Sequence, residues 1–162
     1  MTQRKSRIMI VDDERLNINV LNDILKDDYQ IKVAMTGEQA LKRAVSDPKP
    51  DLILLDIQMP GMGGYEVCSQ LKSDPATHDI PVIFITNLTD EEDEKKGLAM
   101  GAVDYLIKPL RPSIIQARVR THLGLKQVRE SLAERNKELE RLLILRETVE
   151  QISRHDLKGP LS

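Results

Sequence analysis

The chain has 162 residues, which is enough for one ordinary domain and an appended segment. Apolar residues make up 40% of it and allow a packed core, while a formal charge of −2 provides no overall field that would attract nucleic acid or an acidic membrane surface. The single cysteine, Cys68, excludes a disulfide framework and favours a reducing compartment.

The charge is divided unevenly along the chain. Residues 1–110 carry 13 Lys/Arg and 19 Asp/Glu, a formal charge of −6, whereas residues 111–162 carry 11 and 7, a formal charge of +4. This division indicates an acidic globule followed by a mildly basic tail. The first apolar run stops at Asp12, so we expect neither a signal peptide nor a membrane segment, and a cytoplasmic protein.

Short apolar runs alternate with amphipathic stretches through residues 7–110, as is typical of repeated strand–helix units. The runs are almost continuously apolar, which predicts strands buried on both faces of a parallel sheet, at residues 8–11, 31–34, 52–55, 82–85 and 103–107. Helical periodicity predicts helices between them, at roughly 14–27, 37–46, 64–73 and 91–100. Right-handed crossovers then favour an α/β fold with a doubly wound five-stranded sheet in the flavodoxin-like order 2-1-3-4-5.

The pattern changes after Pro112. Residues 125–158 contain no Gly or Pro and are rich in helix-forming residues, which predicts a long helix. Its apolar residues follow coiled-coil a/d spacing, interrupted by Arg135 at one d position and shifted in frame after Leu142: Leu125, Val128, Leu132, Leu139, Leu142, then Leu145, Val149 and Ile152. An apolar stripe of this length must be buried against another surface, so we expect a parallel homodimer through this helix. We also divide the chain into a domain at 1–124 and a coiled-coil helix at 125–162.

Polar residues follow the predicted strands at their carboxyl ends. Asp12 and Asp13 come after the first strand, Asp56 ends the third, Thr86 ends the fourth, and Lys108 follows the fifth. In this type of sheet those ends meet at one edge. Three clustered carboxylates repel each other unless a hard cation lies between them, and Mg²⁺ suits oxygen ligands. A metal-bound carboxylate can attack phosphorus to form an aspartyl-phosphate, whose oxygens an ammonium and a hydroxyl group would neutralise.

Four segments together resemble the receiver domain of two-component response regulators: VDDE (11–14), LLDIQMPG (54–61), IT (85–86) and YLIKP (105–109). The resemblance covers residues 6 to about 124. It implies that Asp56 accepts phosphate from a phosphohistidine donor, which is a histidine kinase or a phosphotransfer protein. It also implies that this chain by itself catalyses no more than its own phosphorylation and slow autodephosphorylation.

The same resemblance assigns the remaining roles. Asp12, Asp13, Asp56 and the main-chain carbonyl of Gln58 would bind Mg²⁺. Thr86 and Lys108 would hold the phosphoryl oxygens, Tyr105 would turn inward when Thr86 moves toward the phosphate, and the Lys108–Pro109 peptide would be cis. One position departs from the family pattern: Asn87 follows Thr86 where a small residue is usual, which puts the rates of phosphorylation and dephosphorylation in question.

A hydrolase of the haloacid-dehalogenase type is an alternative from a different class, because it also uses a nucleophilic Asp on an α/β fold. That mechanism needs a second Asp two residues after the nucleophile, and Gln58 occupies this position. A further alternative is that Asp12 and Asp13 only cap the next helix. The coincidence of Asp56, Thr86 and Lys108 at other strand ends argues against it.

The last residues, SRHDLKGPLS (153–162), resemble the H-box of sensor histidine kinases. The resemblance implies a second phosphoacceptor at His155, with Asp156 as its base and Pro160 as a helix kink. No ATP lid or nucleotide motif follows, so we expect a fragment of a longer receiver–kinase protein.

The leading interpretation is therefore a phosphorelay receiver that switches a dimeric helix feeding a histidine-kinase-like output. Two alternatives stay open. The chain could be the N-terminal part of an active hybrid sensor histidine kinase, or a stand-alone regulator whose coiled coil binds a partner while His155 is incidental.

Overall fold

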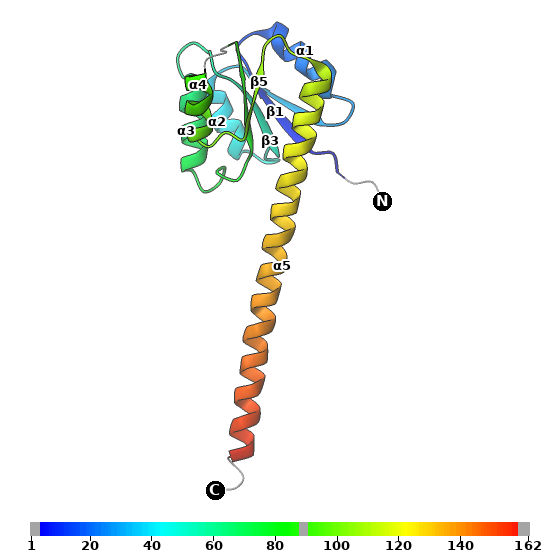
Figure 1. Ribbon diagram of the computed structural model, residues 1–162, viewed down its shortest axis with the longest axis vertical. Helices are drawn as coiled ribbons and strands as arrows, with labels where there is room; N and C mark the ends of the chain where they lie inside the picture. The colour runs from blue at the N-terminus through cyan, green and yellow to red at the C-terminus, as the bar shows by residue number, and fades with distance from the viewer. Residues whose placement is uncertain (1–3, 88–90, 159–162) are drawn as a thin grey trace. The chain divides into compact units, whose positions relative to one another are not determined.

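The computed structural model describes residues 4–87 and 91–158, with the side chains of 91–94 and 156–158 excepted (Figure 1). The chain divides into two compact units, Met1–Gly124 and Leu125–Ser162. In chain order the elements are β1 (Arg7–Val11), α1 (Arg15–Leu25), β2 (Gln30–Ala34), α2 (Gly37–Val45), β3 (Leu52–Asp56), α3 (Gly64–Ser73), β4 (Val82–Thr86), α4 (Glu91–Ala99), β5 (Asp104–Ile107) and α5 (Pro112–Lys158).

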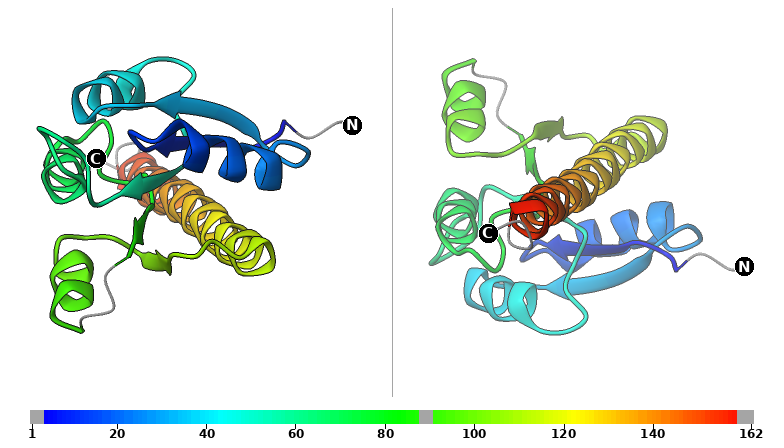
Figure 2. Two further views of the ribbon diagram at one scale, coloured as in Figure 1. Left: turned by 90° about the horizontal axis from the view of Figure 1, so that it is seen from above. Right: turned by 90° about the horizontal axis from the view of Figure 1, so that it is seen from below.

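The five strands form one parallel sheet in the order β2-β1-β3-β4-β5, which confirms the predicted fold class. In β3 and β4 every residue is buried, as their continuous apolar sequences LILLD and VIFIT require. The helices lie on both faces of this sheet in the views of Figure 2. The long helix after residue 112 is also confirmed.

Each face of the sheet has its own hydrophobic core. One core joins the side chains on one face of the strands, such as Met9 and Phe84, to buried side chains of α2 and α3. The other joins the opposite strand faces to α1 and to the first part of α5, through Ile115, Val119 and Leu123. The first three turns of α5 are therefore a structural part of the first unit.

The start of α3 lies unusually close to the end of β3. A Cβ atom on Gly64 would overlap the carbonyl oxygen of Asp56 and would lie 2.7 Å from the Cα of Ile57. Only glycine permits this approach, since the neighbouring atoms belong to the main chain and cannot move aside. The preceding turn contains Gly61 at φ +75°, a conformation that favours glycine. Together these residues determine where the chain leaves Asp56.

From Gln127 to His155 every described side chain of α5 is exposed. The apolar residues of this part of the helix, from Leu125 to Ile152, are between 46% and 64% exposed. Among the described helices, α5 included, none combines the length and apolarity needed to cross a lipid bilayer. The exposed stripe is thus the feature of α5 that needs an explanation.

Replacing Gly64 by alanine is expected to destabilise the fold by about 1–3 kcal/mol, because the added methyl group meets main-chain atoms on β3. The matched control is Gly124→Ala, where no atom lies within 4 Å of the new Cβ. That substitution is expected to stabilise the helix by roughly 0.5–1 kcal/mol. Urea unfolding of both variants measures the difference, and a Gly64→Ala protein as stable as the wild type would contradict the close approach.

Candidate functional site

Three carboxylates converge at the carboxyl edge of the sheet. Asp12 follows β1 and Asp56 ends β3, and the two strands pair side by side, with Val11 opposite Leu55. Asp12, Asp13 and Asp56 can each offer one oxygen such that all three lie within 4.8 Å of one another. Asp12 and Asp56 are only 1% and 3% exposed. The structure therefore brings together the three acidic residues that the sequence singled out.

Both buried carboxylates are held in the same way. The main-chain N–H of Glu14 donates to Asp12 Oδ1 at 2.9 Å, and that of Gln58 donates to Asp56 Oδ1 at 3.2 Å. Each bond spans two residues, which orients the carboxylate by its own turn. The second oxygen of each group is left for another partner. Asp56 Oδ2 lies 3.8 Å from the Lys108 ammonium.

Asp12 Oδ2 is buried and, among the described residues, receives no hydrogen bond. A buried carboxylate oxygen without a donor is unfavourable unless a cation serves it. The atoms that could bind a metal ion here are all carboxylate oxygens, and hard oxygen ligands suit Mg²⁺ better than a softer metal. The residues present therefore fit a magnesium ion, with Asp12, Asp13 and Asp56 as its candidate ligands. The role of the Gln58 carbonyl stays a prediction.

The two buried carboxyl groups of the site are difficult to ionise together, and their pKa values are raised. Burial, followed by repulsion from Asp12, raises the pKa of Asp56 to about 6, although Lys108 and the Gln58 N–H act in the opposite direction. Burial also raises the pKa of Asp12. A divalent cation between the two groups would reverse both effects, because it favours the ionised forms.

Thr86 and Lys108 lie at the neighbouring strand ends. Thr86 is the last residue of β4 and is 1% exposed, one position beyond Ile85, which pairs with Asp56. The N–H of Lys108 donates to the carbonyl of Thr86 at 2.8 Å, so β4 and β5 leave the sheet together. The Lys108–Pro109 peptide is cis, as predicted. Asn87, the departure from the family pattern, is exposed.

Tyr105 packs against the core on the α3 side of the sheet. Its ring centroid is 6.0 Å from that of Phe84, which in turn makes an edge-on contact with Tyr65 at 5.4 Å. A Cβ atom on Gly97 of α4 would lie 2.7 Å from the Tyr105 hydroxyl oxygen. Tyr105 therefore sits in a column of three aromatic rings beneath α4. The sequence offered one signal for this packing, a glycine inside a predicted helix.

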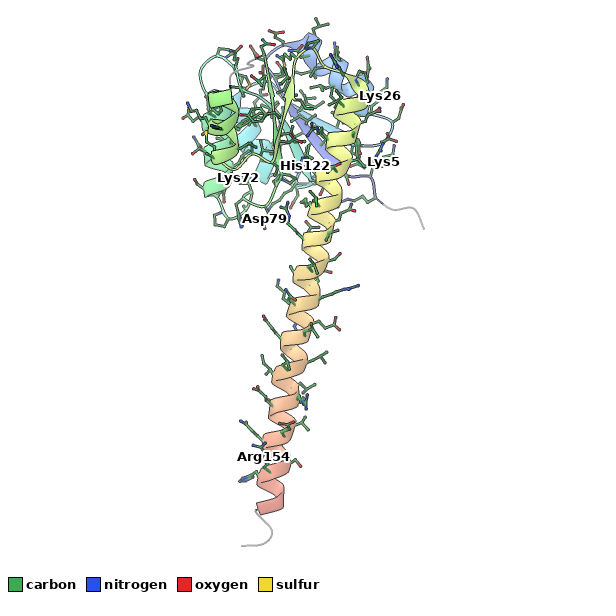
Figure 3. All side chains as sticks on the ribbon, viewed as in Figure 1. Lys5, Lys26, Lys72, Asp79, His122 and Arg154 are labelled. Atoms are coloured by element: carbon green, nitrogen blue, oxygen red, sulfur yellow. The ribbon has the colours of Figure 1, made fainter. Side chains whose placement is uncertain are left out.

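His122 has a partner that the sequence did not indicate. Its Nε2 lies 2.9 Å from Asp104 Oδ2, and Arg118 Nη1 lies 3.0 Å from the same oxygen. Figure 3 labels His122 on the first part of α5. Burial alone would raise the pKa of Asp104, but the hydrogen bond from His122, the N–H of Tyr105 and the Arg118 charge outweigh it and lower the pKa. This cluster fastens α5 to the start of β5.

His155 belongs to the second unit, where its side chain is exposed. The side chain of Asp156 and residues 159–162, Pro160 among them, lie outside the described residues. No geometry therefore bears on the predicted H-box.

A protein-family model described as the response regulator receiver domain matches residues 8–120. The Vibrio cholerae protein named "Probable cyclic di-GMP phosphodiesterase" is 45% identical over 133 residues, covering 82% of this chain and 30% of that protein. The DNA-binding response regulator MtrA of Mycobacterium tuberculosis is 39% identical over 124 residues, covering 76% and 53%. The solved receiver domain of a signal transduction histidine kinase from Syntrophus aciditrophicus is 35% identical, with a TM-score of 0.67, covering 74% of this chain and 90% of that one. The chain thus spans a third to about half of the two curated relatives.

The raised pKa of Asp56 predicts a pH-dependent stability in metal-free buffer. The pKa of the carboxyl group is 3.8 in the unfolded chain and about 6 in the folded one, so the folded state binds more protons between these two pH values. Its contribution to stability is fully present below pH 4 and is lost as the pH rises through 6, by roughly 2–3 kcal/mol in total. Asp56→Asn should remove this loss, so the stability difference between the two proteins should change with pH.

The measurement is urea unfolding of both proteins from pH 4 to 8 in a chelator, repeated with Mg²⁺. Mg²⁺ at pH 7.5 is expected to stabilise the wild type more than Asp56→Asn, because the ion binds the folded, ionised site. A stability difference that stays constant across the pH range would contradict the strained carboxylate pair.

Proposed function

Because the chain belongs to the response regulator receiver family over residues 8–120, we propose that it is a phosphorelay receiver that accepts a phosphoryl group on Asp56 from a phosphohistidine donor. The observation that carries the proposal is the geometry at Asp56. One carboxylate oxygen is held by the Gln58 N–H, while the other lies 3.8 Å from the Lys108 ammonium. Asp12, Asp13 and Asp56 each offer an oxygen within 4.8 Å of the others, and Asp12 Oδ2 has no hydrogen-bond partner among the described residues. The site thus combines a nucleophile, a fixed positive charge and ligands for a cation.

In the proposed reaction Asp56 Oδ2 attacks the phosphorus of the donor. A P–O bond forms, the P–N bond of phosphohistidine breaks, and the imidazole nitrogen leaves with the electron pair and takes a proton from solvent. The Lys108 ammonium stays close to the oxygen that carries the new phosphoryl group. A bound Mg²⁺ would supply charge neutralisation for the phosphoryl oxygens. Asp12 and Asp13 would hold that ion.

The proposed switch runs through Thr86, Tyr105 and β5. A phosphoryl group on Asp56 would attract the Thr86 hydroxyl group at the neighbouring strand end and so alter the space available to Tyr105. Tyr105 packs on one core of the sheet, whereas its neighbour Leu106 packs on the other core together with Ile115 of α5. A displacement of β5 therefore acts on the first turns of α5, which is the mechanical link that the proposal needs.

We also propose that α5 pairs with α5 of a second copy as a parallel coiled coil. Supporting this, the helix beyond residue 124 exposes leucines, isoleucines and valines at the spacing that another helix of the same period can cover. Soluble proteins rarely leave so long an apolar stripe in contact with water. The parallel direction is the one that would place both copies of His155 at the same end of the coiled coil.

The proposed output is a histidine-kinase phosphoacceptor helix that begins near His155, within a cytoplasmic receiver–kinase protein. The resemblance of residues 153–162 to an H-box and the exposed position of His155 on a continuous helix support it. The relatives carry names with different activities and extend well beyond the matched part, so they leave the output open. An active hybrid kinase and a partner-binding coiled coil remain the alternatives.

Incubation with acetyl phosphate and Mg²⁺ is expected to add one phosphoryl group at Asp56, mapped by mass spectrometry. Asp56→Asn should abolish the modification, and removing Mg²⁺ with a chelator should slow it at least about tenfold, because the phosphoryl charge is then poorly neutralised. The control Asp79→Asn changes a carboxylate that is 87% exposed and should leave the rate unchanged.

The same assay with ATP as the only donor is expected to leave the chain unlabelled. Labelling at His155 under these conditions would instead favour an active kinase. A phosphoryl group at a residue other than Asp56, or none after full exposure, would overturn the receiver proposal.

Sedimentation equilibrium tests whether phosphorylation reaches the helix. The chain is expected to self-associate, and beryllofluoride with Mg²⁺, which imitates the phosphoryl group, should change the dimer dissociation constant several-fold, about 1 kcal/mol in coupling. Leu139→Glu should prevent association, since it places a charge in the stripe, whereas Glu140→Gln should not. An association constant that is the same with and without beryllofluoride would contradict the proposed link.

A further inference from the structure

The exposed apolar residues of α5 form two stripes. The proximal stripe consists of Leu125, Val128, Leu132, Leu139 and Leu142, and the distal stripe of Leu142, Leu145, Val149 and Ile152. All of these are exposed, by 46% at Leu125 and by 54–58% at the other residues. Within each stripe the core positions are alternately three and four residues apart, with Arg135 at the position between Leu132 and Leu139. Leu142 and Leu145 are three apart where four would continue the proximal stripe.

The two stripes share positions that repeat every seven residues, among them Val128, Leu142 and Val149. They differ in the second core position of each heptad. The proximal stripe takes the residue three positions before a shared one, as at Leu139, whereas the distal stripe takes the residue three positions after it, as at Leu145.

Neither stripe can continue into the other half of the helix without burying polar groups. Extending the proximal stripe beyond Leu142 would bring Arg146 and Ser153 into the core of a coiled coil. Extending the distal stripe backward would bring in Glu138 and Ser131 instead. Arg135 occupies a shared position and would lie in the core of either phase, so it does not distinguish them, whereas Arg146 and Glu138 each add a charge to the core of only one phase. Because burying an unpaired charge is unfavourable, each half has one preferred phase.

The difference in phase has a definite size. At 3.5 residues per turn, the centre of the distal stripe lies about 50° around the helix from the centre of the proximal stripe. The change occurs at residues 142–145, Leu-Leu-Ile-Leu, which are all more than half exposed and present apolar surface to both phases. An insertion of three residues in a heptad pattern overwinds a coiled coil locally.

We infer that α5 carries two self-association surfaces, about 50° out of phase, that a second copy of this chain covers and that meet at a joint at residues 142–145. The inference rests on the proposed dimer. The second copy is the fitting occupant because the stripes together span 28 residues, four heptads and about 42 Å of helix, with a period that only a matching helix reproduces.

The joint gives His155 two positions relative to the partner helix. When the distal stripe forms the core, His155 flanks it, about 80° from the centre of the contact. If the proximal phase ran through the whole helix, His155 would lie about 130° away, on the side turned from the partner. The phase of the distal half therefore sets how close the His155 imidazole lies to the second copy.

Disulfide trapping of the full chain in a Cys68→Ala background tests the inference. Single cysteines replace Val128, which is in the core of both phases, and the two adjacent pairs Leu139 and Glu138, and Ile152 and Ser153. A disulfide needs Cα atoms within about 7 Å, which only core positions of a parallel pair provide. Leu139→Cys and Ile152→Cys are expected to cross-link at least about tenfold faster than Glu138→Cys and Ser153→Cys.

A double substitution, Arg146→Leu with Ser153→Leu, makes the proximal stripe continuous. In this background cross-linking at Ile152→Cys is expected to slow. Arg146→Leu combined with Ser153→Cys is expected to cross-link faster than Ser153→Cys alone, because position 153 then lies in the core. The matched control, Glu147→Leu with Arg154→Leu, adds the same apolar groups on the opposite side of the helix, where Figure 3 labels Arg154, and should leave the preference at 152.

The outcomes separate the two proposals. Absence of cross-linking at Val128→Cys would overturn the parallel dimer itself. Cross-linking at Val128→Cys together with faster reaction at Ser153→Cys than at Ile152→Cys in the otherwise unchanged chain would leave the dimer standing and overturn the two-phase inference.

Discussion

Two carboxylates, Asp12 and Asp56, are buried side by side at the end of neighbouring strands, and their mutual repulsion governs the site. Each has one oxygen held by a main-chain N–H, so neither can turn away from the other. Burial keeps water from screening the repulsion. Lys108 offsets part of it, and a divalent cation would offset the rest. Burial, followed by this repulsion, raises the pKa of Asp56 in the absence of metal and makes the edge receptive to a cation.

Much of this arrangement follows from sequence because it depends on topology. Once the apolar runs indicate a parallel doubly wound sheet, Asp12, Asp56 and Lys108 must end at one edge, whatever the details of packing. The order of the strands and the extent of the long helix follow from the same periodicity and from the absence of Gly and Pro in residues 125–158. These predictions needed no knowledge of any individual side-chain contact.

Side-chain contacts between helices and strands could not be predicted from the sequence in this way. The Asp104–His122 pair joins residues 18 positions apart, and the column of Tyr65, Phe84 and Tyr105 joins a helix to two strands. Both depend on how a helix rotates and shifts on the sheet, which hydrophobic periodicity leaves undetermined by a residue or more. Periodicity does contain information for α5, because the proposed partner is another copy of the same helix and the spacing itself defines the phase.

The connection between Lys108 and α5 consists of residues 109–111 alone, because the helix begins at Pro112. Three residues can span no more than about 10 Å, so Lys108 and the first turn of the helix are tethered almost directly. A segment that follows residue 124 can therefore differ from one protein to another without altering the residues around Asp56. A short tether of this kind couples the carboxyl edge of the sheet to whatever follows α5, and the two curated relatives, which carry different names, extend well beyond the part that they share with this chain.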